Sequence, residues 1–199
     1  MSTDRKKAFT LIEVLVTLAI ILILAGALLT ARRYLRVRAE RQLTASAIEV
    51  ISTALQQYYD QTGSFPPQVN GLDDTLSGSK DGLRTAMSPQ SVNIVNDVHI
   101  DDLTARACWT SETLFYFLDR VSQSKAILNS LSNRMLTNKG KMGVGLQVQI
   151  GATTYDWVRF VDAWGTAIAY KYTTGDAFPV LMSAGPDKSF ETSDDLNNQ

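Results

Sequence analysis

Between residues 8 and 26 the chain reads AFTLIEVLVTLAIILILAG. From Phe9 to Ala31 the only charged residue is Glu13, and no residue of 14–31 is charged. A helix over 14–31 would be roughly 27 Å long at about 1.5 Å per residue, close to the ~30 Å hydrocarbon core of a bilayer. The segment therefore predicts a membrane-spanning helix.

A cleaved secretory signal is the competing interpretation, because a basic stretch precedes the apolar run and Ala25 and Ala27 form an A-x-A pattern. The run exceeds the ~7–15 apolar residues typical of a signal, and Glu13 at its start is unfavourable there. We therefore favour a retained helix. Charge alone favours the orientation with the downstream side in the cytoplasm, because five arginines follow the run: Arg32, Arg33, Arg36, Arg38 and Arg41.

The stretch KKAFTLIEVLVTLAIILILAG resembles the N-terminus of type IV pilins and type II secretion pseudopilins. The shared pattern is a short basic leader, a small residue, and Phe-Thr-Leu-Ile-Glu at the start of a long apolar helix. The resemblance implies that a prepilin peptidase cuts on the cytoplasmic side, between Ala8 and Phe9, and methylates the new amino terminus. Relatives usually carry Gly before the cut, where this chain has Ala8.

Glu13 is a lone carboxylate near one end of the predicted span. Such a residue costs a few kcal/mol within a membrane and is functional by default. The resemblance implies that the Phe9 amine of one processed subunit pairs with Glu13 of a neighbour, so that the two charges offset each other only on assembly. The alternative is a first-turn Glu favoured by the helix dipole and reaching the headgroups.

The helical pattern continues beyond the apolar run. Apolar residues recur at spacings of three and four from Leu35 to Tyr58, and neither Pro nor Gly lies between Gly26 and Gly63. We expect one helix from about residue 9 to about residue 59, ended by Gly63 and Pro66. The expected fold class is α+β and pilin-like: a long N-terminal helix, half transmembrane and half amphipathic, packed on a small antiparallel sheet.

The remaining chain gives weaker patterns. Residues 68–108 read as a long loop with one short helix, and 111–136 as a helical region capped by Ser111. From Leu146 the apolar period becomes two, which predicts four strands in one antiparallel meander. These are LQVQI, YDWVRFV, AIAYKY and PVLMSA.

The C-terminal pieces VDAWGTAIAYKY and LMSAGPDKSFETSDDL resemble the end of the major pseudopilin of type II secretion, whose terminal loop binds calcium. The resemblance implies side-chain ligands from Asp187, Asp194 and Asp195, with backbone carbonyls near Ala184 and Thr192. Hard oxygen donors in a loop suit calcium. Relatives usually have Gly where this chain has Lys188 and Glu191, and positive φ at such residues costs about 1 kcal/mol or more. The alternative is an acidic, solvated tail.

Other candidate residues read as structural. Asp162, Trp164 and Gly165 are expected to form a turn, with Trp164 anchoring a sheet edge, and Cys108 is expected to be buried. His99 has no nucleophile or metal partner nearby in the sequence. The net charge is −1 and the basic cluster adjoins the apolar run, so no nucleic-acid surface is indicated. We expect no enzymatic activity.

The sequence thus predicts a pseudopilin-like structural subunit of a type II secretion filament that supports protein export. The alternatives are a type IV pilus subunit for adhesion, motility or DNA uptake, and an uncleaved membrane anchor with an extracytoplasmic binding domain. Expected partners are further copies, the peptidase, minor pilin-like subunits, the assembly machinery and the bacterial inner membrane, crossed once with the N-terminus in the cytoplasm. The expected segments are a leader (1–8), a spanning helix (9–31), its amphipathic half (32–62), and a periplasmic head (63–199) with a variable middle (68–150) and a C-terminal sheet and calcium-type loop (151–199).

Overall fold

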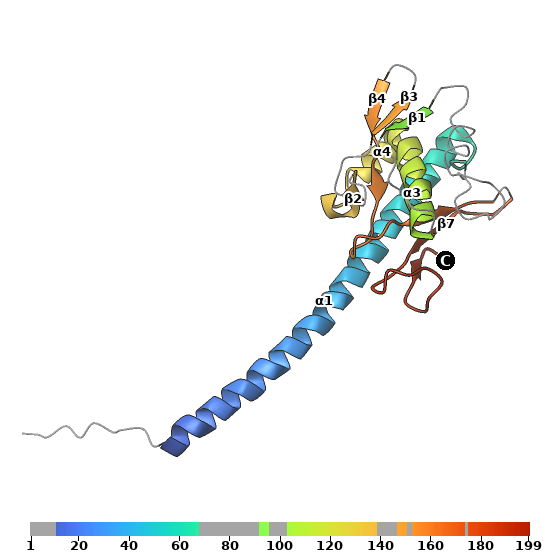
Figure 1. Cartoon of the computed structure of the whole chain (residues 1–199). Helices are drawn as coiled ribbons and strands as arrows, with labels where there is room; N and C mark the ends of the chain where they lie inside the picture. The colour runs from blue at the N-terminus through green and yellow to red at the C-terminus, as the bar shows by residue number, and fades with distance from the viewer. Residues whose placement is uncertain (1–10, 68–91, 96–102, 139–146, 151–152, 174) are drawn as a thin grey trace, which may run out of the picture. The chain divides into compact units, whose positions relative to one another are not determined.

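The computed structural model describes residues 11–67, 92–95, 103–138, 147–150, 153–173 and 175–199 (Figure 1). The chain divides into two compact units, Met1–Ala39 and Glu40–Gln199. Within the described residues, the first unit contains helix alone, whereas the second contains helices and strands around a hydrophobic core. Among the described residues, the buried hydrophobic core therefore belongs to the second unit.

Helix α1 spans Leu11–Thr62, which confirms the long N-terminal helix. It ends where the sequence provides a stop. Gly63 takes φ +74° and its N–H donates to the carbonyl of Tyr59 at 2.8 Å, which makes a left-handed C-terminal cap. Pro66 and Pro67 follow and prevent a further turn.

The first unit carries its large apolar side chains on the surface. Leu11, Ile12 and Ile23 are 83%, 71% and 72% exposed. A search of the described residues finds no helix that combines the length and the apolarity needed to cross a bilayer. Residues 9 and 10 of the expected span, and the side chains of 27–31, lie outside the described part.

The second unit is built on the C-terminal half of α1. One face of this helix is buried with a period of three to four residues, at Ala47, Ile48, Ile51, Ala54 and Leu55. Residues from α3 (Leu103–Arg120), from α4 (Ser122–Leu128), from the strands and from the segments between these elements complete the cluster. The buried partners are Phe65, Leu114, Leu118, Leu128, Leu131, Met135, Phe160, Ile168, Tyr170 and Leu181.

The central helical region differs from its prediction. Ser111 lies inside α3, which begins at Leu103, so its expected role as a cap is wrong. The Ser111 hydroxyl instead bonds to the backbone of Phe160. The region also breaks at Val121, whose extended backbone (ψ 117°) separates α3 from α4, and a 3-10 turn, η1, follows at Asn133–Met135.

The strands form three small antiparallel sheets instead of the single predicted meander (Figure 1). The first pairs β1 (Val92–Val95), β3 (Gln147–Ile150) and β4 (Thr153–Asp156). The second pairs β2 (Leu136–Thr137) with β5 (Arg159–Phe160). The third pairs β6 (Ala169–Lys171), β7 (Val180–Ser183) and β8 (Leu196–Asn197). The α+β, pilin-like arrangement of a long helix on small antiparallel sheets is confirmed.

Candidate functional site

Glu13 lies in the first turn of α1 and is exposed. Its neighbours Ile12 and Val14 are apolar and also exposed, at 71% and 56%. The helix therefore presents one carboxylate within a surface of aliphatic side chains. Ala8 and Phe9, the expected cleavage and methylation residues, lie outside the described residues.

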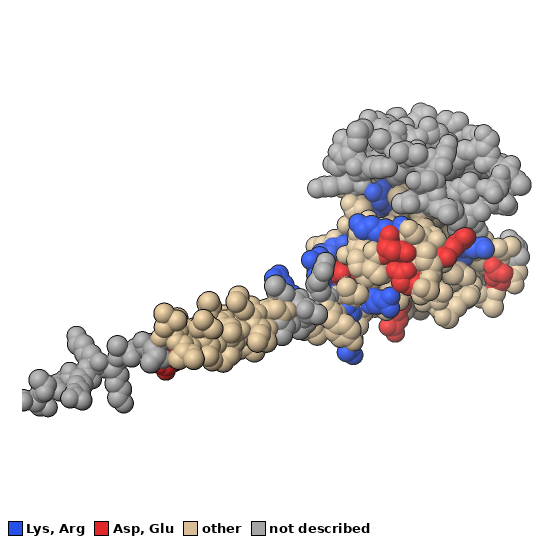
Figure 2. Space-filling model, turned by 60° about the horizontal axis from the view of Figure 1, so that its bottom comes forward, with Lys and Arg blue, Asp and Glu red and all other residues tan. Residues whose placement is uncertain are grey.

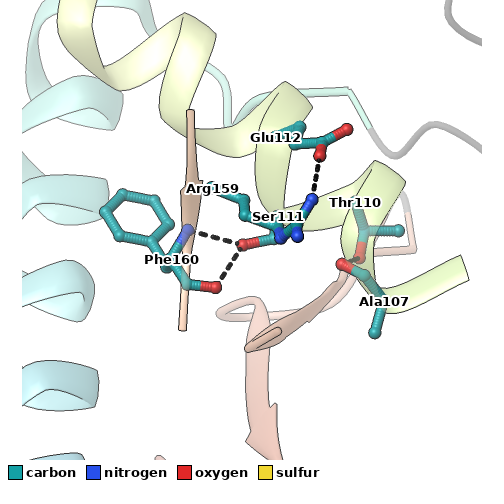
Figure 3. Close-up of polar contacts among 6 residues, drawn as sticks. All are labelled: Ala107, Thr110, Ser111, Glu112, Arg159 and Phe160. Carbon is teal, nitrogen blue, oxygen red and sulfur yellow. Dashed lines mark hydrogen bonds and ion pairs between the residues drawn. The ribbon is translucent and has the colours of Figure 1, made fainter. Parts of the chain in front are cut away.

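Strand β5, which precedes the turn that leads into the C-terminal sheet, is tied to helix α3 by buried polar contacts (Figure 3). The Arg159 guanidinium donates to Glu112 Oε1 at 2.8 Å, and the two side chains are 10% and 0% exposed. Ser111 donates to the carbonyl of Phe160 and accepts from its N–H, at 3.0 and 2.9 Å. These bonds connect α3 to β5, and sequence reasoning missed them because no local pattern pairs residues 47 positions apart.

The Asp162 side chain organises the turn between β5 and β6. Its Oδ1 accepts from the N–H groups of Trp164 and Thr166, at 3.0 and 2.8 Å, and its Oδ2 accepts from the Ser183 hydroxyl at 2.7 Å. Gly165 takes φ +85° in this turn. The expected structural roles of Asp162 and Gly165 are confirmed, and the contact with Ser183 also links the turn to β7.

Burial raises the pKa of the Asp162 carboxyl above its ordinary value. The hydrogen bonds from Ser183, Thr166, Trp164 and Gly165 act in the opposite direction but do not cancel the effect of burial. Asp162 is 1% exposed, so its charged form lacks water and depends on those donors. The carboxyl is therefore a structural group at the base of the C-terminal loop.

The loop from Ala184 to Asp195, here called the terminal loop, follows β7. The expected ligands Asp187, Thr192, Asp194 and Asp195 share one hydrogen-bonded network. The Asp187 N–H donates to Asp194 Oδ2 at 3.3 Å, and the Thr192 hydroxyl donates to Asp194 Oδ1 at 2.6 Å and lies 3.2 Å from Asp195 Oδ1. The hydrogen bond from Thr192 lowers the pKa of Asp194 below its ordinary value, because it stabilises the carboxylate form.

Two unusual backbone conformations shape the terminal loop. Lys188 and Glu191 have φ values of 63° and 69°, and they are the two non-glycine residues with positive φ among the described residues. The N–H of Glu191 donates to Asp195 Oδ2 at 2.8 Å, so its conformation is coupled to an expected ligand. Both positions, at which relatives usually carry Gly, therefore have the left-handed backbone that glycine adopts most easily.

Gly185 closes the loop on itself. Its φ is +64°, and a Cβ atom there would lie 2.6 Å from the carbonyl oxygen of Asp194. Its N–H donates to the Ser183 hydroxyl, which in turn donates to Asp162. Ala184, an expected carbonyl ligand, is fully buried directly before this contact. The two ends of the loop therefore meet at a point where only glycine fits.

The donor chemistry of the terminal loop fits calcium, because its side chains offer carboxylate and hydroxyl oxygens and no soft ligand. Within the described part of the chain, however, no three His, Cys, Asp or Glu side chains are gathered as they would be around a bound metal ion. Cys108 is buried, as expected, and His99 lies outside the described residues.

Comparison with known proteins identifies the N-terminal segment. Residues 3–29 match a family model described as the prokaryotic N-terminal methylation motif. The matched range contains Ala8, Phe9 and Glu13, and it supports the type IV pilin and pseudopilin family. No curated protein and no solved structure matches the chain.

Proposed function

We propose that this chain is a prepilin-like structural subunit, cut between Ala8 and Phe9 and polymerised into a type II secretion pseudopilus-like filament that supports protein export. The observation that carries the proposal is the methylation motif at residues 3–29, which runs directly into a helix whose C-terminal half forms the core of an α+β head. The subunit performs no chemistry itself, and the assembly machinery supplies the work.

Assembly on this proposal depends on an apolar surface and one charge. The exposed aliphatic side chains of 11–26 pack against the same segment of neighbouring subunits, which removes them from lipid or water. The Phe9 amine of one subunit pairs with Glu13 of another. Because each charge is costly in an apolar environment, the pair favours the assembled state over the isolated subunit.

The proposed location is the bacterial inner membrane before assembly. Residues 9–31 cross it once, the N-terminus faces the cytoplasm and the head lies in the periplasm. A prepilin peptidase then acts on the leader, and minor pilin-like subunits and the assembly machinery join the subunits into a filament. The basic leader residues Arg5, Lys6 and Lys7 on the cytoplasmic side agree with this orientation.

Calcium is the proposed ligand of the terminal loop. Asp187, Asp194 and Asp195 would hold it, with the carbonyls of Ala184 and Thr192. A bound ion would link the residues after β7 to those before β8 and so fix the end of the third sheet. Support comes from the left-handed backbone at Lys188 and Glu191, the hydrogen-bonded acidic network and the close contact at Gly185.

A type IV pilus subunit is the second candidate, because the methylation motif is common to both kinds of filament. The chain has a single cysteine and so lacks the paired C-terminal cysteines common in adhesive pilins. Genes for secretion components beside this one favour export, whereas genes for pilus retraction favour the pilus.

Mass spectrometry of the mature N-terminus tests the proposal. After co-expression with a prepilin peptidase, the account expects a chain that begins with N-methylated Phe9. A matched Phe9→Ala variant should be cut but differ in mass at the first residue, which verifies the assignment. A chain that retains Met1, or one that begins after Ala27, contradicts the proposal.

A further inference from the structure

The segment that follows the apolar run carries exposed cations on opposite faces of α1. Arg32 and Arg36 are four residues apart and share one face, whereas Tyr34 and Arg38 are four residues apart on the other. All four side chains are exposed, and Tyr34 is 68% exposed. We call these four residues the arginine collar. Figure 2 shows basic side chains gathered beyond the tan, uncharged stretch of the helix.

The arrangement around the helix indicates the kind of partner. A helix that docks on one protein surface presents a stripe to it, with other residue types on the opposite face. The collar has an arginine on both faces, and no acidic residue lies between Val14 and Ala39. Such a distribution fits an environment that surrounds the helix, as a layer of lipid headgroups does.

The position along the helix fits the same layer. The collar begins at Arg32, directly after the uncharged residues 14–31, and Arg38 lies about 9 Å further along the axis. The headgroup layer on one side of a bilayer is about 5–8 Å thick. Tyrosine is enriched at that depth, and arginine binds phosphate oxygens in a bidentate manner.

We propose that the arginine collar binds anionic phospholipid headgroups at the outer end of the apolar segment and fixes the depth of the subunit in the membrane. The inference rests on the proposed function, because insertion along 9–31 is what brings the collar to the headgroups. The positive-inside rule favours arginines on the cytoplasmic side, whereas the proposed orientation places these arginines on the periplasmic side. Headgroup binding gives them a role there.

The test uses the purified full chain in micelles of an uncharged detergent, doped with phosphatidylglycerol or, in a parallel arm, phosphatidylethanolamine. Native mass spectrometry counts the lipid that each chain retains. The wild type should retain phosphatidylglycerol over phosphatidylethanolamine, and R32Q/R38Q should weaken phosphatidylglycerol retention roughly 25-fold, at about fivefold per cation. The control R134Q/K171Q, which removes two exposed cations from the second unit, should bind as the wild type does.

Equal phosphatidylglycerol retention by R32Q/R38Q and the wild type overturns the proposal. The proposal is also overturned if the control R134Q/K171Q loses as much phosphatidylglycerol as R32Q/R38Q does. Loss of filament assembly by R32Q/R38Q with unchanged lipid retention also overturns it, because the collar would then contact a neighbouring subunit. Circular dichroism of each variant verifies the helix. The micelle measurement requires neither cleavage of the leader nor assembly into filaments. Failure of the proposed function is therefore detected separately, as a chain that keeps its leader in the mass spectrometry of the N-terminus.

Discussion

Lys188 and Glu191 hold a left-handed backbone that glycine adopts more easily, at φ 63° and 69°. Each costs roughly 1 kcal/mol or more relative to an unstrained residue. The surrounding hydrogen bonds, such as that from the Glu191 N–H to Asp195, offset part of this cost. The sequence identified these two positions as departures from the Gly of relatives, but it did not show which backbone conformation they adopt.

Gly185 provides a sharper test of the terminal loop. Gly185→Ala should destabilise the second unit by roughly 3 kcal/mol, because the new Cβ meets the Asp194 carbonyl and the backbone has positive φ. The matched control is Gly63→Ala. Its φ is also positive, at +74°, but a Cβ added there would have no atom within 4 Å apart from those of the adjacent residues, so its cost should be about 1 kcal/mol. Urea denaturation measures both. Equal costs would show that the close contact at Gly185 does not constrain the loop.

Among the elements, the turn at Asp162 joins β5 and β6 to β7 through one carboxylate. Its Asp-x-Trp-Gly pattern was readable in the sequence, but the contact with Ser183 was not, because it bridges residues 21 positions apart. The second unit also contains strands of only two residues, β2, β5 and β8. Such strands have no alternating pattern, and the predicted single meander was wrong for that reason.

The raised pKa of Asp162 gives a pH dependence with a definite sign. The folded state binds the proton more tightly than the unfolded state, whose pKa is near the ordinary 3.8. The contribution of Asp162 to the free energy of unfolding is therefore largest below 3.8 and falls as pH rises toward the folded pKa.

Asp162→Asn isolates this effect, because the amide keeps the acceptor for Trp164 and Thr166 but does not titrate. The unfolding free energy of the wild type minus that of the variant should decrease as pH rises from 3.5 to 7, with the change beginning near 3.8. Denaturant melts of the second unit across this range provide the values, and other carboxyl groups cancel in the difference. A difference that is constant or that grows with pH is incompatible with the burial of this carboxyl.

For the molecule as a whole, local sequence patterns predicted the long helix, whereas the packing of the second unit depends on contacts between distant residues. The uncharged run of 14–31 and the apolar period from Leu35 to Tyr58 together predicted most of α1, because both patterns are local. The buried pair Glu112–Arg159 and the three-sheet arrangement depend on distant contacts, which one sequence does not reveal. The candidate residues Ala8, Phe9 and Glu13, and the acidic residues of the terminal loop, could be recognised because each set belongs to a short contiguous motif.

The proposed calcium site would affect the second unit as a whole, because the terminal loop connects β7 to β8. If calcium binds the native state selectively, 5 mM calcium should raise the Tm by a few degrees relative to EGTA, for a gain of about 1–3 kcal/mol. Asp194→Asn should remove the increase. Magnesium in place of calcium controls for ionic strength, and an identical Tm in calcium and chelator removes the metal from the account.

If Glu13 drives the assembly of processed subunits, a chain without this carboxylate should stay out of filaments, and the filament incorporation of Glu13→Ala measures this. The matched control is Glu49→Ala, which removes an exposed carboxylate from the same helix within the second unit. Filaments, whether periplasmic or at the cell surface, are separated from membranes, and the methylated mature chain is measured in each fraction. Glu13→Ala should be inserted, cut and methylated but absent from filaments, whereas Glu49→Ala should be incorporated. Incorporation of Glu13→Ala at the wild-type level would show that Glu13 does not drive assembly.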